Sequence, residues 1–120
     1  MHKDDTIRLR HMLDAARQAI LFVQGRTRTD LDRDTMLMLA LVKLVEIVGE
    51  AASQVTDMGR AKAPDIPWAD ITSMRHRLVH AYFDINLDIL WQTVEHDLPT
   101  LIVLLEQALN GEGIDGQHNH

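Results

Sequence analysis

The sequence predicts an all-α fold. Apolar residues recur at steps of three and four along most of the chain, which is the period of one helix face. Aromatic residues make up only 4% of the chain, so residues that favour strands are scarce. With 120 residues, of which 46% are hydrophobic, the chain can build one core. We expect a single bundle of four or five helices over residues 1–110, followed by a flexible tail over residues 111–120.

The first helix is predicted from its end signals and its apolar face. Thr6 is a good N-cap residue, and Gly25 suits the left-handed position that follows a helix. Between them, apolar residues such as Leu9 and Met12 trace one face. A polar, turn-forming stretch over residues 25–34 should connect this helix to the next.

The second predicted helix, from Met36 to about Gly59, is the most apolar segment of the chain. Residues 36–42 are apolar on every side, whereas only one side of a helix in so small a monomer can face other helices. The sequence therefore predicts that a second subunit covers this helix in a homodimer. Close backbone packing at Gly49 within a single chain is an alternative that the sequence leaves open.

The remainder of the chain predicts further helices and no strand. Pro67 suits the first turn of a third helix, which should run to about Ala81. Asn86 can cap a fourth helix, in which Pro99 either introduces a kink or opens a fifth helix. The last helix should end at Asn110-Gly111.

Composition excludes several classes of protein. The chain has no cysteine, which rules out a disulfide scaffold, a thiol nucleophile and a thiolate-ligated metal site. The first five residues are largely charged, and the longest apolar run has seven residues, so we expect neither a signal peptide nor a membrane span. These features predict a soluble, cytoplasmic protein.

The charge is distributed unevenly. The net charge of −6 argues against a general nucleic-acid coat, which needs a basic stripe. However, all 12 Lys and Arg residues lie at or before Arg77, so residues 1–77 carry +1 and residues 78–120 carry −7. A polyanionic ligand could therefore approach the first part of the chain with little repulsion.

One segment, residues 73–84, differs in composition from the rest of the bundle. It contains two Arg, two His, the only Tyr and an Asp. Cleavage of a phosphodiester without a metal needs a cation that binds the phosphate and a group that moves the proton of the attacking hydroxyl. Arg75 and His80 are residue types suited to these two tasks.

The spacing of these residues leaves two arrangements open. Arg75 and His80 are five positions apart, which places them roughly 140° apart around a continuous helix. They could converge if the helix loosens near His80, or if two copies meet across a dimer axis. His76 and His80, four apart, would share a face at the spacing of a two-histidine metal site, but no third ligand has a recognisable offset. We expect no metal and no cofactor.

Two carboxylates of the second helix, Glu46 and Glu50, would also share a face, because they are four positions apart. They could form a catalytic pair. Lys43 is within reach of Glu46, however, so a solvated or interface face is the preferred interpretation.

The motif Arg75-x-x-x-x-His80-x-Tyr82 resembles the R-x-x-x-x-H-x-Y signature of the HepT-like branch of the HEPN superfamily. Other segments resemble this family in the same order along the chain. These segments are Ile47–Ala52, Pro64–Trp68, and Trp91 with Asp97–Pro99. Together they cover nearly the whole chain to about Leu105.

The resemblance implies a HEPN-type homodimer that acts as the toxin of a type VII-like toxin–antitoxin pair. Members are metal-independent endoribonucleases, with transfer RNA a plausible substrate. Arg75 would orient the scissile phosphate, and His80 would be the acid–base catalyst or a phosphate ligand. A cognate minimal nucleotidyltransferase would adenylylate Tyr82 and silence the toxin. His76 and Arg77 would support RNA binding.

One position departs from the family pattern. The residue after the motif arginine is commonly Asn, and here it is His76. This departure and the acidic net charge keep an alternative open, in which the protein is a non-catalytic module that binds a nucleotide or partners a nucleotidyltransferase. Growth arrest on expression would distinguish a toxin from such a module.

Overall fold

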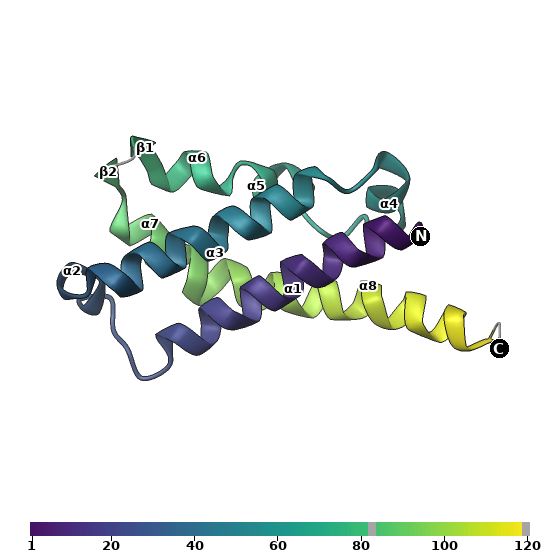
Figure 1. Ribbon diagram of the computed structural model, residues 1–120, viewed down its shortest axis with the longest axis horizontal. Coiled ribbons are helices and arrows are strands. Elements are labelled where there is room, and N and C mark those ends of the chain that lie inside the picture. Colours follow the sequence, from purple (N-terminus) through teal and green to yellow (C-terminus); the bar gives the residue numbers. More distant parts are fainter. Residues whose placement is uncertain (82–83, 119–120) are drawn as a thin grey trace.

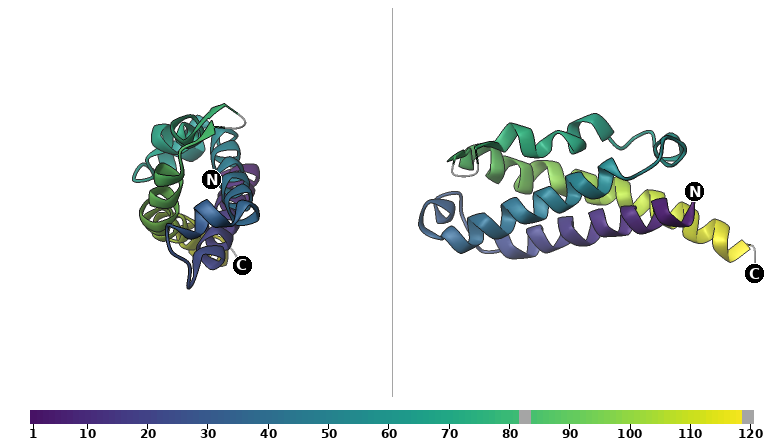
Figure 2. Two further views of the ribbon diagram at one scale, coloured as in Figure 1. Left: turned by 90° about the vertical axis from the view of Figure 1, so that its left-hand side faces the viewer. Right: turned by 45° about the horizontal axis from the view of Figure 1, so that its top comes forward.

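Three long helices set the frame of the molecule in the computed structural model, which describes residues 1–81 and 84–118 and the side chains as far as residue 111, apart from residues 82 and 83. Helix α1 (Lys3–Val23) packs against α3 (Thr35–Ser53) and against α8 (Leu98–His118). Most of the shorter helices lie against α3, and a small hairpin lies beyond one of them (Figures 1 and 2). The all-α prediction is therefore correct for the bulk of the chain.

Helix α1 begins earlier than the sequence predicts. The Nδ1 atom of His2 accepts a hydrogen bond from the Asp4 N–H at 3.0 Å, so His2 is the N-cap and Thr6 lies within the helix. Asp4 and Asp5 stand in the first turn, where negative charge stabilises the helix dipole. The predicted end is confirmed, because Gly25 has a φ of 72°, which favours glycine.

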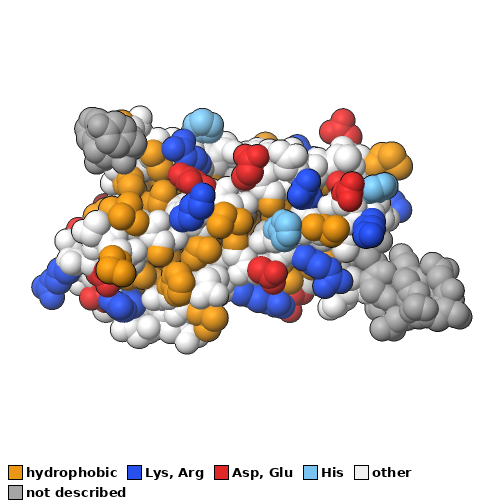
Figure 3. All heavy atoms as spheres, viewed as in Figure 1, with side chains coloured by type: hydrophobic (Ala, Val, Ile, Leu, Met, Phe, Trp, Pro, Cys, Tyr) orange, Lys and Arg blue, Asp and Glu red, His pale blue; other side chains and the backbone are white. Residues whose placement is uncertain are grey.

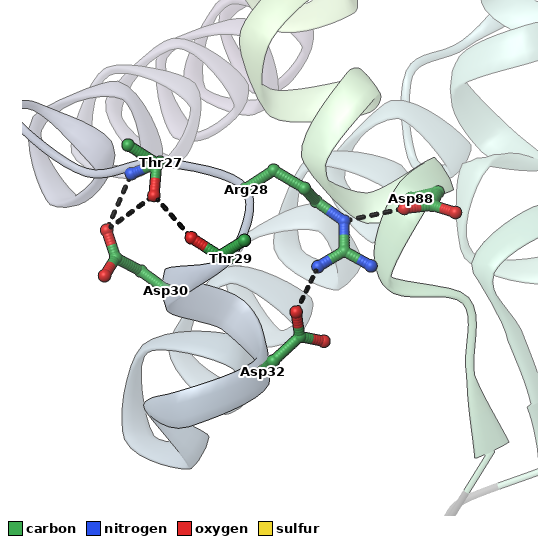
Figure 4. A network of polar contacts seen from close by, with 6 residues as sticks. All are labelled: Thr27, Arg28, Thr29, Asp30, Asp32 and Asp88. Atoms are coloured by element: carbon green, nitrogen blue, oxygen red, sulfur yellow. Dashed lines mark hydrogen bonds and ion pairs between the residues drawn. The ribbon is translucent and has the colours of Figure 1, made fainter.

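The connection after Gly25 contains a short helix, α2 (Asp30–Arg33), which is fixed by Arg28. The Arg28 Nε donates to Asp88 Oδ1 at 2.7 Å, and a terminal nitrogen donates to Asp32 Oδ2 at 3.2 Å (Figure 4). The hydrogen bond to Asp88 raises the pKa of the Arg28 guanidinium above its usual value. This network joins the α1–α3 connection to α7 (Leu87–Gln92).

Helix α3 lies against several elements at once, which explains part of its apolar character. It contacts α1, α2, α5, α6 and α7, and Leu41, Val45 and Val48 are fully buried. Met36 and Leu39, however, remain 82% and 54% exposed. Hydrophobic side chains gather over this end of the α1–α3 face (Figure 3).

The predicted second helix is in fact two helices. Helix α3 ends at Ser53, and α4 (Asp57–Lys62) follows, with the Thr56 hydroxyl accepting from the Gly59 N–H at 3.1 Å. A buried carboxylate, Asp5, accepts hydrogen bonds from the Thr56 N–H at 2.9 Å and from the Thr56 hydroxyl at 2.6 Å. Burial opposes ionisation of Asp5, but these hydrogen bonds outweigh it and lower its pKa.

The predicted third helix, from Pro67 to Ala81, is wrong in its second half. The chain forms α5 (Trp68–Thr72) and α6 (Met74–Leu78), then an antiparallel pair of short strands, β1 (Val79–Ala81) and β2 (Asp84–Ile85). Val79 is β-branched and extended, and the Asn86 N–H donates to the Leu78 carbonyl at 2.7 Å to close the hairpin. The expectation of no strand is therefore corrected.

The last helical segment is continuous but irregular. The cap at Asn86 is confirmed, since its Oδ1 accepts from the Ile89 N–H at 3.0 Å. Helix α7 leads into a π-helical turn, Thr93–Asp97, and Pro99 lies in the first turn of α8. The predicted end of the last helix at Asn110-Gly111 is wrong, because α8 continues to His118. The flexibility of residues 111–120 stays a prediction. None of the described helices is long and apolar enough to cross a membrane.

Candidate active site

The predicted motif begins on α6, where successive residues point in different directions because each turns by about 100°. Arg75 points towards α3, and its Nε donates to the Glu46 Oε1 at 2.9 Å. The Arg75 side chain is about half exposed, at 49%. One edge of its guanidinium is therefore held by the bundle while the group stays accessible to solvent.

Arg75 and His76 line a cavity with a volume of about 690 Å³. Walls of this cavity come from α1, α3, α5 and α6, on the face that Figure 3 shows. Three Lys or Arg side chains line it against two carboxylates, although the whole chain carries −6. The charged and histidine residues of the lining are Arg8, His11, Lys43, Glu46, Glu50, Arg75 and His76.

Arg77 lies on a different side of α6. One of its terminal nitrogens donates to the Asp70 carbonyl at 3.1 Å. Its side chain lines a separate cavity of about 220 Å³, together with His96 and Asp97. The structure thus brings His76, but not Arg77, into the same cavity as Arg75.

His80 lies on β1, two residues beyond the end of α6, and is exposed. The helix therefore ends before His80, as one of the two arrangements left open by the sequence requires, while convergence across a dimer axis stays a prediction. His80 does not line the cavity of Arg75 within this chain. Tyr82 lies outside the described residues.

The proposed helical face shared by His76 and His80 does not exist, because α6 ends at Leu78. Within residues 1–81 and 84–118, no three His, Asp or Glu side chains are grouped so that they could hold a metal ion. The charged and histidine side chains that line the cavity in the described part of the chain are acid–base and cationic groups.

Sequence reasoning missed Arg8 and His11 as contributors to the cavity, and it placed Lys43 rather than Arg75 beside Glu46. Arg8 and His11 come from α1 and Lys43 from α3, and Glu46 pairs with Arg75 rather than with Lys43. The Glu46–Arg75 pair spans 29 positions, so no local motif signals it. The only available signal was the spacing of Arg8 and His11, which places them on one helix face.

The chain is similar to known proteins of one family. The family described as ribonuclease HepT-like matches residues 12–108. A protein described as a candidate RNase of Caldanaerobacter subterraneus subsp. tengcongensis is 34% identical over 104 residues, which cover 87% of this chain and 93% of that protein. A probable ribonuclease HepT of Thermococcus cleftensis is 33% identical over 93 residues, covering 74% of this chain and 84% of that protein. No solved structure matches the chain. The chain therefore belongs to the HepT-like ribonuclease family of the HEPN superfamily.

Proposed function

We propose that this protein is a metal-independent endoribonuclease and the toxin of a toxin–antitoxin pair. The observation that carries the proposal is Arg75, which is half exposed, held by Glu46 and open to a cavity with surplus positive charge. Membership of the HepT-like family and relatives named as ribonucleases support the same activity. Transfer RNA is the substrate class we favour from the resemblance.

The proposed reaction uses Arg75 and His80 in separate roles. Because Glu46 engages Nε, the two terminal nitrogens of Arg75 are left to bind the non-bridging oxygens of the scissile phosphate. His80 takes the proton of the attacking 2′-hydroxyl as the new oxygen–phosphorus bond forms, and the 5′-oxygen leaves with a proton returned from solvent or from His80. Arg75 stabilises the negative charge that develops on the phosphorane.

A homodimer is part of the proposal. Met36 and Leu39 on α3 and Leu21 on α1 leave large apolar surface in contact with water at one end of the molecule. Covering such a patch is a common reason for association. A second copy could also bring its own His80 towards the cavity of Arg75, which would complete the site.

Silencing of the toxin is proposed to occur at Tyr82. A cognate minimal nucleotidyltransferase would transfer AMP from ATP to the Tyr82 hydroxyl and release pyrophosphate. The added phosphate brings negative charge close to the motif and would repel RNA. Incubation with that enzyme and ATP should raise the mass by one adenylyl group, and Tyr82→Phe should abolish the shift.

The activity is tested with untagged protein and RNA in EDTA. We expect cleavage by the wild type and none by Arg75→Ala or His80→Ala. The matched controls are Arg33→Ala and His96→Ala, which replace exposed side chains outside the Arg75 cavity. Circular dichroism should show the same helix content in all variants. Equal cleavage by Arg75→Ala, His80→Ala and the controls would contradict the assignment.

A second candidate function is a non-catalytic module that binds a nucleotide or partners a nucleotidyltransferase. It is favoured by His80 not lining the Arg75 cavity within one chain, and by His76 at the position where the family commonly has Asn. Such a module should not arrest growth when expressed, and it should bind a nucleotide without cleaving RNA. Growth arrest that depends on His80 would exclude it.

A further inference from the structure

Two cations in the Arg75 cavity have no partner in the part of the chain that the structure describes. Arg8 and Lys43 line the cavity from α1 and α3. Among the residues that the structure describes, neither side chain makes a hydrogen bond or an ion pair. The carboxylates beside them are already engaged, since Glu46 accepts from Arg75 at 2.9 Å and Glu50 accepts from Gln54 at 3.2 Å.

The lining of the cavity extends along α3. Along α3 its lining runs from Lys43 to Gln54, which corresponds to about 16 Å at the rise of an α-helix. Arg8 and His11, about one turn apart on α1, also line the cavity. A single nucleotide would fill only part of such a groove, whereas a chain of nucleotides could follow it.

Among the residues that the structure describes, no Phe, Tyr or Trp side chain lines the groove. Proteins that hold single-stranded RNA through its bases use aromatic stacking platforms, while cations bind the phosphates whatever the sequence. The chemistry of this lining therefore suits the backbone of an RNA strand.

We propose that Arg8, His11 and Lys43 bind the phosphates of the RNA strand next to the scissile phosphate held by Arg75. The inference rests on the proposed ribonuclease function and adds the path of the substrate. His11, which lines the same cavity, contributes a hydrogen-bond donor. Because these contacts are made to phosphates, the groove binds a longer stretch of the RNA strand without selecting its sequence.

The test compares Arg8→Ala and Lys43→Ala with Arg10→Ala, which removes an exposed arginine of α1 that lies outside the cavity. Binding of single-stranded RNA with a 2′-O-methyl block at every position is followed by fluorescence anisotropy at several salt concentrations. Each cavity variant should raise the Kd about 2- to 5-fold and lower the slope of log K against log salt by about 0.7. The loss should be equal for oligouridylate and oligoadenylate, and larger for long strands than for a dinucleotide. Arg10→Ala should leave both Kd and slope near the wild-type values.

Cleavage by the wild type is measured in parallel, so that the two proposals can fail separately. If the wild type cleaves RNA and the cavity variants bind RNA as tightly as Arg10→Ala does, the proposed RNA-binding role of the groove is wrong and the ribonuclease assignment stands. If the wild type binds the blocked RNA through Arg8 and Lys43 but cleaves nothing, the groove stands and the ribonuclease assignment is wrong. ATP and tripolyphosphate are also tested as competitors of the bound RNA. If either displaces it at a concentration far below the concentration of unlabelled RNA that is needed, the cavity is a nucleotide site and the proposed RNA groove is wrong. Arg8→Lys should recover most of the affinity lost in Arg8→Ala, which separates a charge effect from a folding defect.

Discussion

Replacing Gly59 with alanine tests the contact between the first helix and the α3–α4 turn. A Cβ atom at Gly59 would lie 2.5 Å from the Asp5 Oδ2, 2.7 Å from the Asp5 Cγ and 2.9 Å from the Val55 Cγ1. All three distances are shorter than carbon contacts in proteins allow. Because Asp5 is fully buried, its carboxylate cannot swing into solvent without moving α1.

The expected cost follows from what must give way. If Asp5 moves, its two hydrogen bonds with Thr56 weaken, and a hydrogen bond to a charged group contributes about 1.5–3 kcal/mol. If the backbone moves instead, overpacking costs about 1–3 kcal/mol. Alanine returns up to about 1 kcal/mol through its higher helix propensity. We expect Gly59→Ala to lower the free energy of unfolding by about 1–3 kcal/mol.

Urea unfolding followed by circular dichroism measures this change, at one protein concentration because a dimer would link stability to concentration. Gly111→Ala is the control, since a Cβ there meets nothing within 4 Å. That variant should be as stable as the wild type or slightly more stable. Asp5→Ala combined with Gly59→Ala should cost less than the sum of the single changes, because the clash is then removed. A Gly59→Ala protein as stable as Gly111→Ala would refute the reasoning.

Four further outcomes are expected. The pKa of Asp5 is lowered in the folded protein, so the stability that its ionised form contributes is complete above pH 3.8, the usual pKa of the group. This contribution is lost as the pH falls through the lower pKa of the folded state. Urea titrations in acid should show the loss for the wild type and not for Asp5→Asn. Leu39→Asp should shift sedimentation towards the monomer, whereas Asp32→Ala should not. Arg28→Ala should speed hydrogen exchange in α2 more than Arg33→Ala does, since Arg28 joins α2 to α7. RNA binding should have a shallow salt slope of about −2, as three cations contact phosphates, and a much steeper slope would contradict the assigned cavity.

Much of the fold could be predicted from local signals. The apolar period located the long helices, Gly25 located the end of the first, and Asn86 located the start of α7. Each of these is a feature of a few neighbouring residues, so it survives without knowledge of tertiary packing. The prediction of Thr6 as the N-cap is wrong, because His2, an unusual capping residue, accepts the hydrogen bond of the helix start instead.

The hairpin could not be predicted in the same way. Strands of three and two residues are too short to show an alternating pattern, and Val79 would also fit the apolar face of a continuing helix. The hydrogen bond from Asn86 to Leu78 that closes the turn joins residues eight positions apart. The helical continuation to Ala81 was therefore a reasonable extension of a local pattern that tertiary contacts override.

The candidate site could also be predicted only in part. Arg75 and His80 became candidates because their residue types and the family motif are local features of the sequence, while their relative positions were left open. The other wall of the cavity, with Arg8 and Lys43, arises only when α1 and α3 pack together. The motif segment, residues 73–84, carries no signal for this contact between distant parts of the chain.

The packing of α1 against α8 has a consequence for synthesis. Residues of α1 such as Leu9 and Met12 are fully buried, and Arg17 on α1 pairs with Glu106 on α8 at 3.5 Å. Chains fold as they leave the ribosome, N-terminal part first, so α1 and α3 emerge long before the helix that covers them. A fragment released before α8 is made would keep the packing of α1 against α3 and lose its packing against α8, so we expect the helix that carries Arg8 to be less stable in such a fragment.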